Sequence, residues 1–320
     1  MPRDNGGTTP TRLESSTIDS IMNMSPPADL RDAIRCLAVS LSACLAVACL
    51  TLSSSTLRAQ EGSTTSPAST ATAPASTAPA SGGPVDPALI EDLVAANRIL
   101  AAQGIFDAFG HVSVRHPGDP NRFLLARSVA PELVTAEDII EYDLDAVPVN
   151  LNGRSQYSER FIHAAIYRQR PDVNAIVHNH SRNVIPFSVS TVPIRPVFHN
   201  AAFIGTGLPV FDIGAQFGAT DMLVETAERG AALAETLGDR PAVLMRGHGV
   251  AVVGQNLKFA VGRSIYLEAN AGVQLQAIGL GGKVTYLSPD EATLVVETGE
   301  NGGYERPWEL WKRHAFQGER

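Results

Sequence analysis

Two histidines lie two positions apart in the segment "AIVHNHSRN", at positions 178 and 180. The apolar residues 175–177 before them are typical of a buried strand. Because side chains at i and i+2 of a strand point to the same face, both imidazoles can reach one ion while Asn179 turns away. A pair of hydrogen-bonded core or surface histidines is the structural alternative. The chemistry that this spacing offers is coordination of a divalent cation.

A third histidine strengthens the metal interpretation. His248 lies in "RGHG", where glycines on either side leave room for close approach and the apolar segments "AVLM" and "VAVV" predict two flanking strands. Three neutral imidazoles with an open coordination position suit zinc, manganese, iron or cobalt. We therefore predict a divalent metal ion, with zinc as the first choice, at His178, His180 and His248.

Two further candidates lie on the helix predicted by "YSERFIHAAIYRQRP", which ends at Pro171. Glu159 is in the first turn, and His163 follows one turn later on the same face. Both side chains could face a cleft at the end of the sheet as catalytic groups. The alternatives are an ordinary first-turn acid for Glu159 and a core histidine for His163.

The elements that must position these residues alternate along the chain. Asp86 and Gly104 delimit a helix that starts with Pro87. Further predicted elements are strands at 111–115 and 122–127, a helical turn at 135–138, a helix at 221–238, two strands within 241–255, a helix at 256–279 and two short helices in the tail. Hairpins beside helical crossovers indicate the α/β class, as one three-layer α/β/α domain with a central mixed or antiparallel sheet.

The N-terminal part of the chain has a different character. Residues 36–52 form an uncharged apolar run after a basic flank, and Ala59 offers a cleavage point. We expect residues 1–59 to be an export signal or an uncleaved membrane anchor, so that the protein is periplasmic or tethered facing the periplasm. Residues 60–84, rich in Ser, Thr, Ala and Pro, predict a disordered linker, and the folded domain spans 85–320.

Cysteine usage and charge narrow the chemistry. All three cysteines, Cys36, Cys44 and Cys49, lie in the apolar run, so the domain has no disulfide and a metal must bind through histidine and carboxylate. The net charge of −8 makes nucleic acid an unsuitable partner.

The ordered set "YSERFIHAAIY", "VHNHS" and "RGHGVAVVG", together with "GIFDAFGHVSVR", resembles the class II aldolase and adducin family over most of residues 85–315. The resemblance implies a class II aldolase-like α/β/α fold and a homotetramer with active sites between subunits. It also implies that Glu159 is an acid/base or fourth ligand and that His178, His180 and His248 hold the metal.

The family branch is indicated by the residues around the expected substrate. His111 and Tyr157 replace residues that bind phosphate in sugar-phosphate aldolases of this type. The segments "LLARSVAPELVTAEDIIEYDLD" and "RPWELWKRHA" resemble instead the decarboxylases of hydroxylated aromatic or pyridine carboxylates. There Arg127 and Ser128 would bind a carboxylate, and His111 would orient the substrate. Many relatives have Pro at the position of Arg182. This arginine either recruits the small anionic substrate that the resemblance implies or covers the surface.

The sequence thus predicts a metal-dependent carbon–carbon lyase, a decarboxylase of a small hydroxylated aromatic or hydroxy-carbonyl carboxylate. Glu159 or His163 would protonate the carbon after carbon dioxide leaves. A retro-aldolase acting on an unphosphorylated hydroxy-carbonyl compound, an Fe(II) oxygenase and a non-catalytic adducin-like scaffold are the alternatives.

Overall fold

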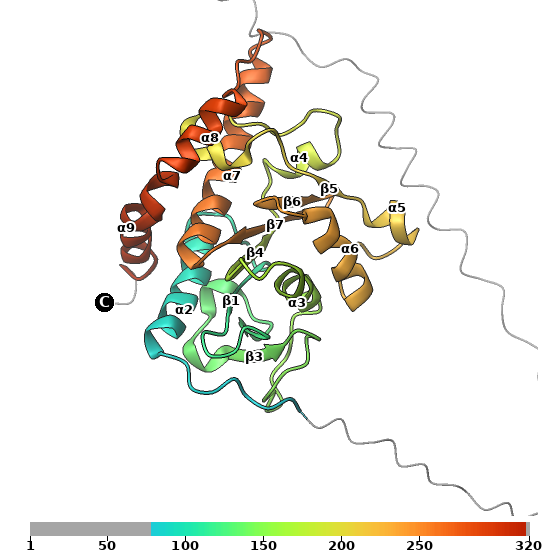
Figure 1. Ribbon diagram of the computed structural model, residues 1–320, viewed down its shortest axis with the longest axis vertical. Helices are drawn as coiled ribbons and strands as arrows, with labels where there is room; N and C mark the ends of the chain where they lie inside the picture. Colours follow the sequence, from blue (N-terminus) through green and yellow to red (C-terminus); the bar gives the residue numbers. More distant parts are fainter. Residues whose placement is uncertain (1–77, 318–320) are drawn as a thin grey trace, which may run out of the picture. The chain divides into compact units, whose positions relative to one another are not determined.

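A seven-stranded mixed sheet forms the centre of residues 78–317, the part of the chain that the computed structural model describes (Figure 1). The strand order is β3-β2-β1-β4-β7-β6-β5, and only β5 and β6 run parallel. The strands are β1 (His111–Arg115), β2 (Arg122–Ala126), β3 (Ile139–Asp143), β4 (Ala175–Asn179), β5 (Val210–Phe211), β6 (Ala242–Met245) and β7 (Gly249–Gly254). The predicted mixed sheet is therefore confirmed.

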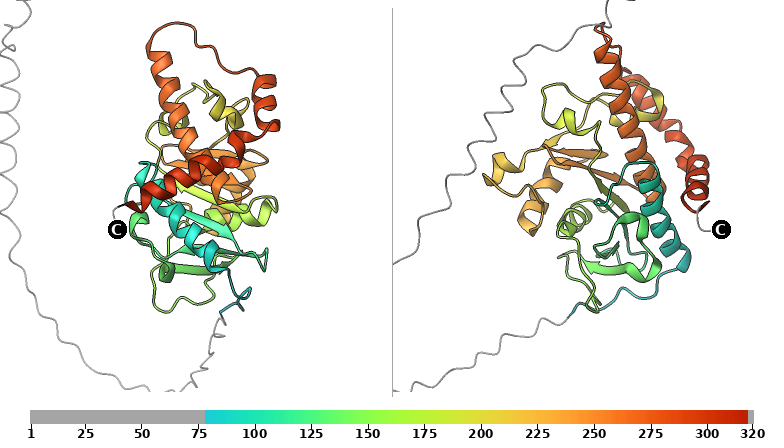
Figure 2. Two further views of the ribbon diagram at one scale, coloured as in Figure 1. Left: turned by 90° about the vertical axis from the view of Figure 1, so that its left-hand side faces the viewer. Right: turned by 180° about the vertical axis from the view of Figure 1, so that it is seen from behind.

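Helices cover both faces of this sheet, as Figures 1 and 2 show. On one face lie α2 (Pro87–Ala102), α7 (Leu257–Gly279) and α9 (Glu305–Ala315). The other face is covered by α3 (Arg160–Gln169) and α6 (Ala227–Leu237). Shorter elements are η1 (Pro131–Leu133), η2 (Ala136–Asp138), α4 (Ile185–Ser188), η3 (His199–Ile204), α5 (Ile213–Phe217), α8 (Pro289–Glu297) and η4 (Glu300–Tyr304). The predicted α/β/α layering is confirmed.

Helix ends follow the capping residues of the sequence. Asp86 accepts a hydrogen bond from the backbone N–H of Ala88, and Pro87 begins α2. The side chain of Asn256 accepts from the N–H of Phe259 at the start of the long helix α7. These caps satisfy backbone donors that a helix leaves unpaired, and each helix starts within one residue of the predicted position.

The start of α6 differs from the sequence prediction. The pattern predicts a helix from residue 221, but α6 begins at Ala227 with Thr226 as its N-cap. Residues 221–226 form a loop in which Met222 has a φ of 70°. Backbone groups of this loop hydrogen-bond to two of the candidate site residues, and this tertiary contact overrides the local helical pattern.

The segment before residue 86 falls partly outside the described residues. The predicted export segment 1–59 and the linker up to residue 77 lie outside them. Within the rest of the predicted linker, the Ser81 hydroxyl and the Gly82 N–H both donate to the Glu141 carboxylate, each at 2.7 Å. Between residues 78 and 317, no helix combines the length and apolar character that crossing a bilayer requires.

Strand alternation decides which side chains reach the candidate site. In β1, Val112 packs in the core below α2 and α7, so its neighbours His111 and Ser113 point toward α3. In β4, Val177 packs in that same core and His178 points toward α3. His111 and His178 are directly opposite each other in the antiparallel pair β1–β4. The two central strands β1 and β4 therefore present polar side chains to α3.

Candidate metal centre

The register of the central strands β4 and β7 brings the three predicted histidines together where β4 ends and β7 begins. His178 pairs with Ala251, and His180 directly follows β4. His248 occupies the turn between β6 and β7, where its N–H donates to the carbonyl of Met245. A Cβ at Gly249 would overlap the carbonyl oxygen of Asn179, so glycine is required for this close approach.

One carboxylate completes the cluster. Each of Glu159, His178, His180 and His248 offers one ligand atom, and these atoms all lie within 4.8 Å of one another. The Nε2 atoms of His180 and His248 are 3.2 Å apart. Glu159 Oε2 lies 3.4 Å from His178 Nε2 and 3.5 Å from His248 Nε2. Between residues 78 and 317, this is the only such group of possible metal ligands.

Backbone carbonyls fix the orientation of two of the rings. His178 Nδ1 lies 3.2 Å from the Val250 carbonyl oxygen, and His248 Nδ1 lies 2.9 Å from that of Met222. Because a carbonyl only accepts, each Nδ1 carries the proton when the ring is neutral. The lone pair of each Nε2 then points into the cluster, which is the tautomer that a metal requires.

His178 Nε2 shows that the cluster fits a metal ion. This atom is buried and has no hydrogen-bond partner among the described residues, although Glu159 lies 3.4 Å away. A buried polar atom without a partner is uncommon in a native protein. A divalent cation held by the three imidazoles, with the Glu159 carboxylate as a fourth ligand or as a neighbouring acid/base, would satisfy it, and such ligands suit the predicted metals.

Electrostatics place two of the candidate ligands, Glu159 and His180, in protonation states that suit a metal ion. Burial raises the pKa of Glu159, but the interactions with His178 and His248 outweigh burial and hold this pKa well below its usual value. Burial, aided by the neighbouring His178, lowers the pKa of His180 to about 4. The pKa of His248 is raised because the contact with Glu159 outweighs the effect of burial. At neutral pH, Glu159 is therefore ionised and His180 is neutral, as metal binding requires.

The Glu159 carboxylate is also held by the backbone. Its Oε1 accepts a hydrogen bond of 2.9 Å from the N–H of Val224, in the loop before α6. Glu159 itself is the N-cap residue of α3, with φ −86° and ψ 18°. Its side chain turns to the cluster while the helix carries the following residues elsewhere.

A cavity of about 680 Å³ opens onto this cluster. Its lining includes three of the four candidate ligands and is otherwise formed by small, apolar and uncharged polar residues; it comprises Ala108, Phe109, Gly110, His111, Ser128, Val129, Ala130, Gln156, Tyr157, Ser158, Glu159, His180, Leu223 and His248. No lysine or arginine among the described residues lines it. His178 lies below the cavity surface and is fully buried.

Three residues with expected roles lie outside the cavity. Arg127 pairs with Asp138 at 2.5 Å and does not line the cavity. Arg182 is exposed and also lies outside the lining, which agrees with the surface alternative. His163 is fully buried behind His111 and has no access to the cavity. Of the expected substrate-binding residues, His111 and Ser128 do line the cavity.

Sequence reasoning missed the backbone groups that orient the ligands. The carbonyl of Met222 and the N–H of Val224 carry no side-chain signal, and their segment has a helical pattern. The cavity wall also contains Gln156, whose Oε1 is buried without a hydrogen-bond partner in the described part of the chain. Tyr157, another wall residue, is fixed by a 2.6 Å hydrogen bond from its hydroxyl to the Val129 carbonyl.

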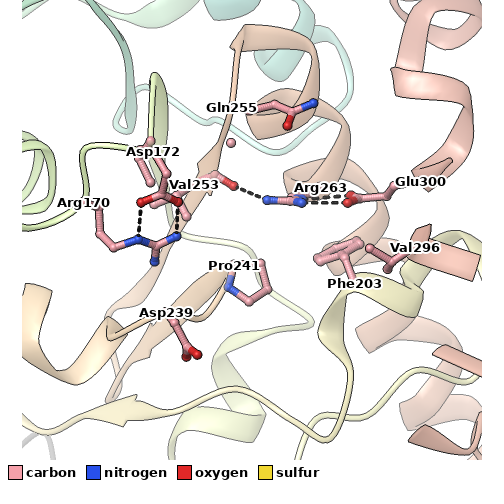
Figure 3. A pocket seen from close by; sticks show the side chains of 12 residues that line it. Arg170, Asp172, Phe203, Asp239, Pro241, Val253, Gln255, Arg263, Val296 and Glu300 are labelled. Atoms are coloured by element: carbon pink, nitrogen blue, oxygen red, sulfur yellow. Dashed lines mark hydrogen bonds and ion pairs between the residues drawn. The ribbon is translucent and has the colours of Figure 1, made fainter. Parts of the chain in front are cut away.

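A second pocket lies at the opposite end of β7 and has a different character (Figure 3). Its volume is about 310 Å³. Arg263 donates to both oxygens of Glu300, at 2.8 and 2.6 Å, and to the carbonyl of Val253. Arg170 likewise pairs with Asp172. Because both arginines of this pocket already have carboxylate partners, the histidine cluster remains the better candidate site.

Comparison with known proteins identifies the family. Residues 91–275 match the Class II Aldolase and Adducin N-terminal domain, and the chain belongs to this family. Decarboxylase tropJ of Talaromyces stipitatus is 32% identical over 251 residues, which cover 72% of this chain and 94% of that protein. The 3,4-dihydroxyphthalate decarboxylase of Arthrobacter keyseri is 31% identical over 233 residues, covering 68% and 90%.

A solved structure extends this comparison. L-fuculose 1-phosphate aldolase from Glaciozyma antarctica superposes with a TM-score of 0.61 at 26% identity, over 74% of this chain and 95% of that one. The class II aldolase fold and the decarboxylase-like branch are thereby confirmed. Together, these relatives support a class II aldolase-like lyase with a small-molecule substrate.

Proposed function

We propose that the protein is a metal-dependent decarboxylase of a small hydroxylated carboxylate, aromatic or hydroxy-carbonyl. The observation that carries this proposal is the convergence of Glu159, His178, His180 and His248 at the base of a cavity. Three imidazoles around an accessible position are a ligand set for a Lewis-acid metal site, and the Glu159 carboxylate lies beside them as the acid/base of the proposed reaction.

The cavity wall favours a planar, largely apolar substrate. Phe109, Val129, Tyr157 and Leu223 supply aromatic and aliphatic surface. A phosphate dianion would meet no lysine or arginine of the described residues there, which disfavours a phosphorylated sugar. Ser128 and His111 offer uncharged polar groups for one carboxylate or hydroxyl. Two relatives named as decarboxylases support this substrate class.

A bound divalent ion would supply Lewis-acid stabilisation of the charge that develops on substrate oxygens. Glu159 Oε1 is engaged by Val224, so Oε2 is the atom available for proton transfer. In the proposed reaction, Oε2 accepts the proton of a substrate hydroxyl. The bond to the carboxylate then breaks, carbon dioxide leaves, and the electron pair stays on the carbon. Oε2 returns the proton to that carbon, so atoms and charge balance.

His163 does not share this role. Its ring is fully buried, and burial lowers its pKa to about 3, so at neutral pH it holds no extra proton to give. The protonating group of this proposal is Glu159 alone.

The proposal is tested by product analysis on a defined panel. Hydroxybenzoates, dihydroxyphthalates and hydroxypyridine carboxylates labelled with 13C in the carboxyl group are incubated with the full chain, with and without added Zn²⁺, Mn²⁺ or Fe²⁺. Metal-dependent release of labelled carbon dioxide is expected. His178→Ala should abolish it, whereas His199→Ala is the matched control, because His199 is exposed and outside the cavity. Retention of release and metal in His178→Ala would eliminate the proposal.

A retro-aldolase is the second candidate, favoured by the structural similarity to L-fuculose 1-phosphate aldolase. It would release an aldehyde rather than carbon dioxide from an unphosphorylated hydroxy-carbonyl compound. Adding such compounds to the panel separates the two reactions. Oxygen consumption that depends on added iron would instead indicate an Fe(II) oxygenase, and a protein without affinity for metal would indicate a scaffold.

A further inference from the structure

Four side chains form a continuous hydrogen-bonded row from the cavity wall into the core. His111 Nδ1 lies 2.6 Å from His163 Nε2, and His163 Nδ1 lies 2.6 Å from Ser113 Oγ. Ser113 Oγ in turn lies 2.8 Å from the hydroxyl of Tyr167. His111 and Ser113 come from one face of β1, and His163 and Tyr167 come one turn apart on α3. We call these four residues the histidine relay.

The buried end of the histidine relay determines which group donates in each of its hydrogen bonds. Within residues 78–317, the Tyr167 hydroxyl has only Ser113 Oγ as a hydrogen-bond neighbour. Its proton therefore has a partner only if Tyr167 donates to Ser113, which must then donate to His163 Nδ1. In the reverse direction this buried hydroxyl proton would have no acceptor, a penalty that corresponds to a population ratio of roughly 5 to 150.

The same direction determines the tautomer of His111. Since His163 Nδ1 accepts, its Nε2 carries the proton and donates to His111 Nδ1. His111 must then carry its own proton on Nε2. Among the described residues this Nε2 has no hydrogen-bond partner, and His111 lines the cavity. Because the Nδ1 atom of each ring accepts a hydrogen bond in this direction, neither His111 nor His163 carries a second ring proton.

We propose that Tyr167, Ser113 and His163 are positioning residues that hold His111 as a neutral imidazole whose Nε2–H donates a hydrogen bond to a substrate oxygen. The ring of His111 lies 5.1 Å from that of His178 and 4.6 Å from that of Tyr157, between the metal cluster and the cavity wall. The recognised group is therefore an acceptor, a carboxylate or phenolate oxygen next to the atoms that a metal would bind. This substrate assignment rests on the proposed function, whereas the tautomer does not.

The tautomer can be observed directly in the full chain. Long-range 1H–15N correlation spectra of metal-free protein labelled with 15N-histidine distinguish Nε2–H, Nδ1–H and imidazolium rings. At pH 7.5 His111 should show the Nε2–H pattern, and His111→Gln assigns its signals by their loss. An Nδ1–H or doubly protonated His111 would overturn the proposal. Because the spectrum needs neither metal nor turnover, a failure of the proposed function is a separate result.

Two substitutions of Ser113 test whether the group at this position determines the tautomers of His163 and His111. Ser113→Asp places a carboxylate that accepts from both Tyr167 and His163, so His163 and then His111 should reverse to their Nδ1–H tautomers. Ser113→Ala provides no acceptor for His163 and should leave His111 in its Nε2–H form. Unchanged His111 signals in a folded Ser113→Asp protein would refute the positioning role. If this variant does not fold, the wild-type spectrum still decides the proposal.

Substrate recognition is read with salicylate as the probe. Titration of salicylate into Zn²⁺-loaded wild-type protein should shift the His111 Nε2–H proton resonance downfield, because the N–H then donates to a carboxylate or phenolate oxygen. His111→Phe keeps a ring against Tyr157 but lacks the donor, and its affinity for salicylate should fall by roughly tenfold or more. Binding of salicylate without any change at His111 would overturn the assigned contact.

Discussion

Acidification is expected to destabilise the protein through His163, a fully buried imidazole with a known set of neighbours. His111 and Ser113 hydrogen-bond to it, Phe123 stacks on its ring, and His178 and Glu159 contribute charge. Burial lowers its pKa from the ordinary value of 6.5 to about 3 in the folded protein. Between these two values the unfolded state binds a proton that the folded state does not, so stability falls as pH decreases. At pH 5, about 1.5 pH units below the unfolded pKa, the loss is about 2 kcal/mol.

Urea unfolding at pH 7.5 and at pH 5.0 measures this loss. Wild type and His163→Gln are each compared with themselves at the two pH values, so any constant effect of the substitution cancels. The loss of unfolding free energy on acidification should be smaller in His163→Gln by about 2 kcal/mol. His111 and His180 also have lowered pKa values, but both proteins retain them. His199→Gln, at an exposed position, is the control. An equal loss in wild type and His163→Gln would refute the reasoning.

Three other predictions concern the site itself. Glu159→Gln should keep the fold, because its amide oxygen can still accept from Val224, but should lower turnover by roughly 10²–10⁴-fold in a carbon dioxide assay; near-normal turnover would exclude the proton-transfer role. Arg127→Gln should leave KM unchanged and cost up to about 1 kcal/mol in urea unfolding, because the guanidinium pairs with Asp138 and is 36% exposed. A KM increase of about tenfold or more would contradict this placement. Removing a bound metal with a chelator should cost about 2.7 kcal/mol if the free metal had been at 100 times its Kd, or roughly 5–10 °C in Tm by calorimetry; an unchanged Tm would argue against a bound ion.

The cluster of candidate metal ligands could be predicted because its members are marked by side-chain type and by their spacing in the sequence. His178 and His180 obey the two-residue alternation of a strand, and His248 sits in a Gly-His-Gly turn between apolar runs. The structure brings these residues and Glu159 together because β4 and β7 are neighbours. Which strands pair depends on tertiary structure. The sequence pattern therefore suggested that these residues meet but could not establish it.

The position of His163 was harder to anticipate. Glu159 and His163 are four residues apart, a spacing that places two side chains on one helix face. However, Glu159 is the N-cap residue and lacks helical backbone angles, so its side chain leaves that face. His163 is within the helix and reaches Ser113 and His111 on β1. The exact helix start, which is among the least certain features of a sequence pattern, decides the role of His163.

Arg127 and the loop before α6 show what long-range contacts add. In the sequence, Arg127 has no evident partner and was expected to bind a substrate carboxylate. In the structure it donates to the carboxylate of Asp138, eleven residues away. Residues 221–226 have a helical pattern, yet Met222 and Val224 give their backbone groups to His248 and Glu159. Residue types do not reveal backbone hydrogen bonds to distant side chains, so these backbone groups could be identified only from the structure.

Metal content measured by mass spectrometry on purified protein tests the central claim most directly. The account predicts about one divalent ion per wild-type chain, either as purified or after dialysis against Zn²⁺, and its loss in a folded His178→Ala protein while His199→Ala retains it. A wild-type protein that neither contains nor takes up a divalent metal, or a His178→Ala protein that binds it as wild type does, would contradict the claim that these imidazoles share one ion.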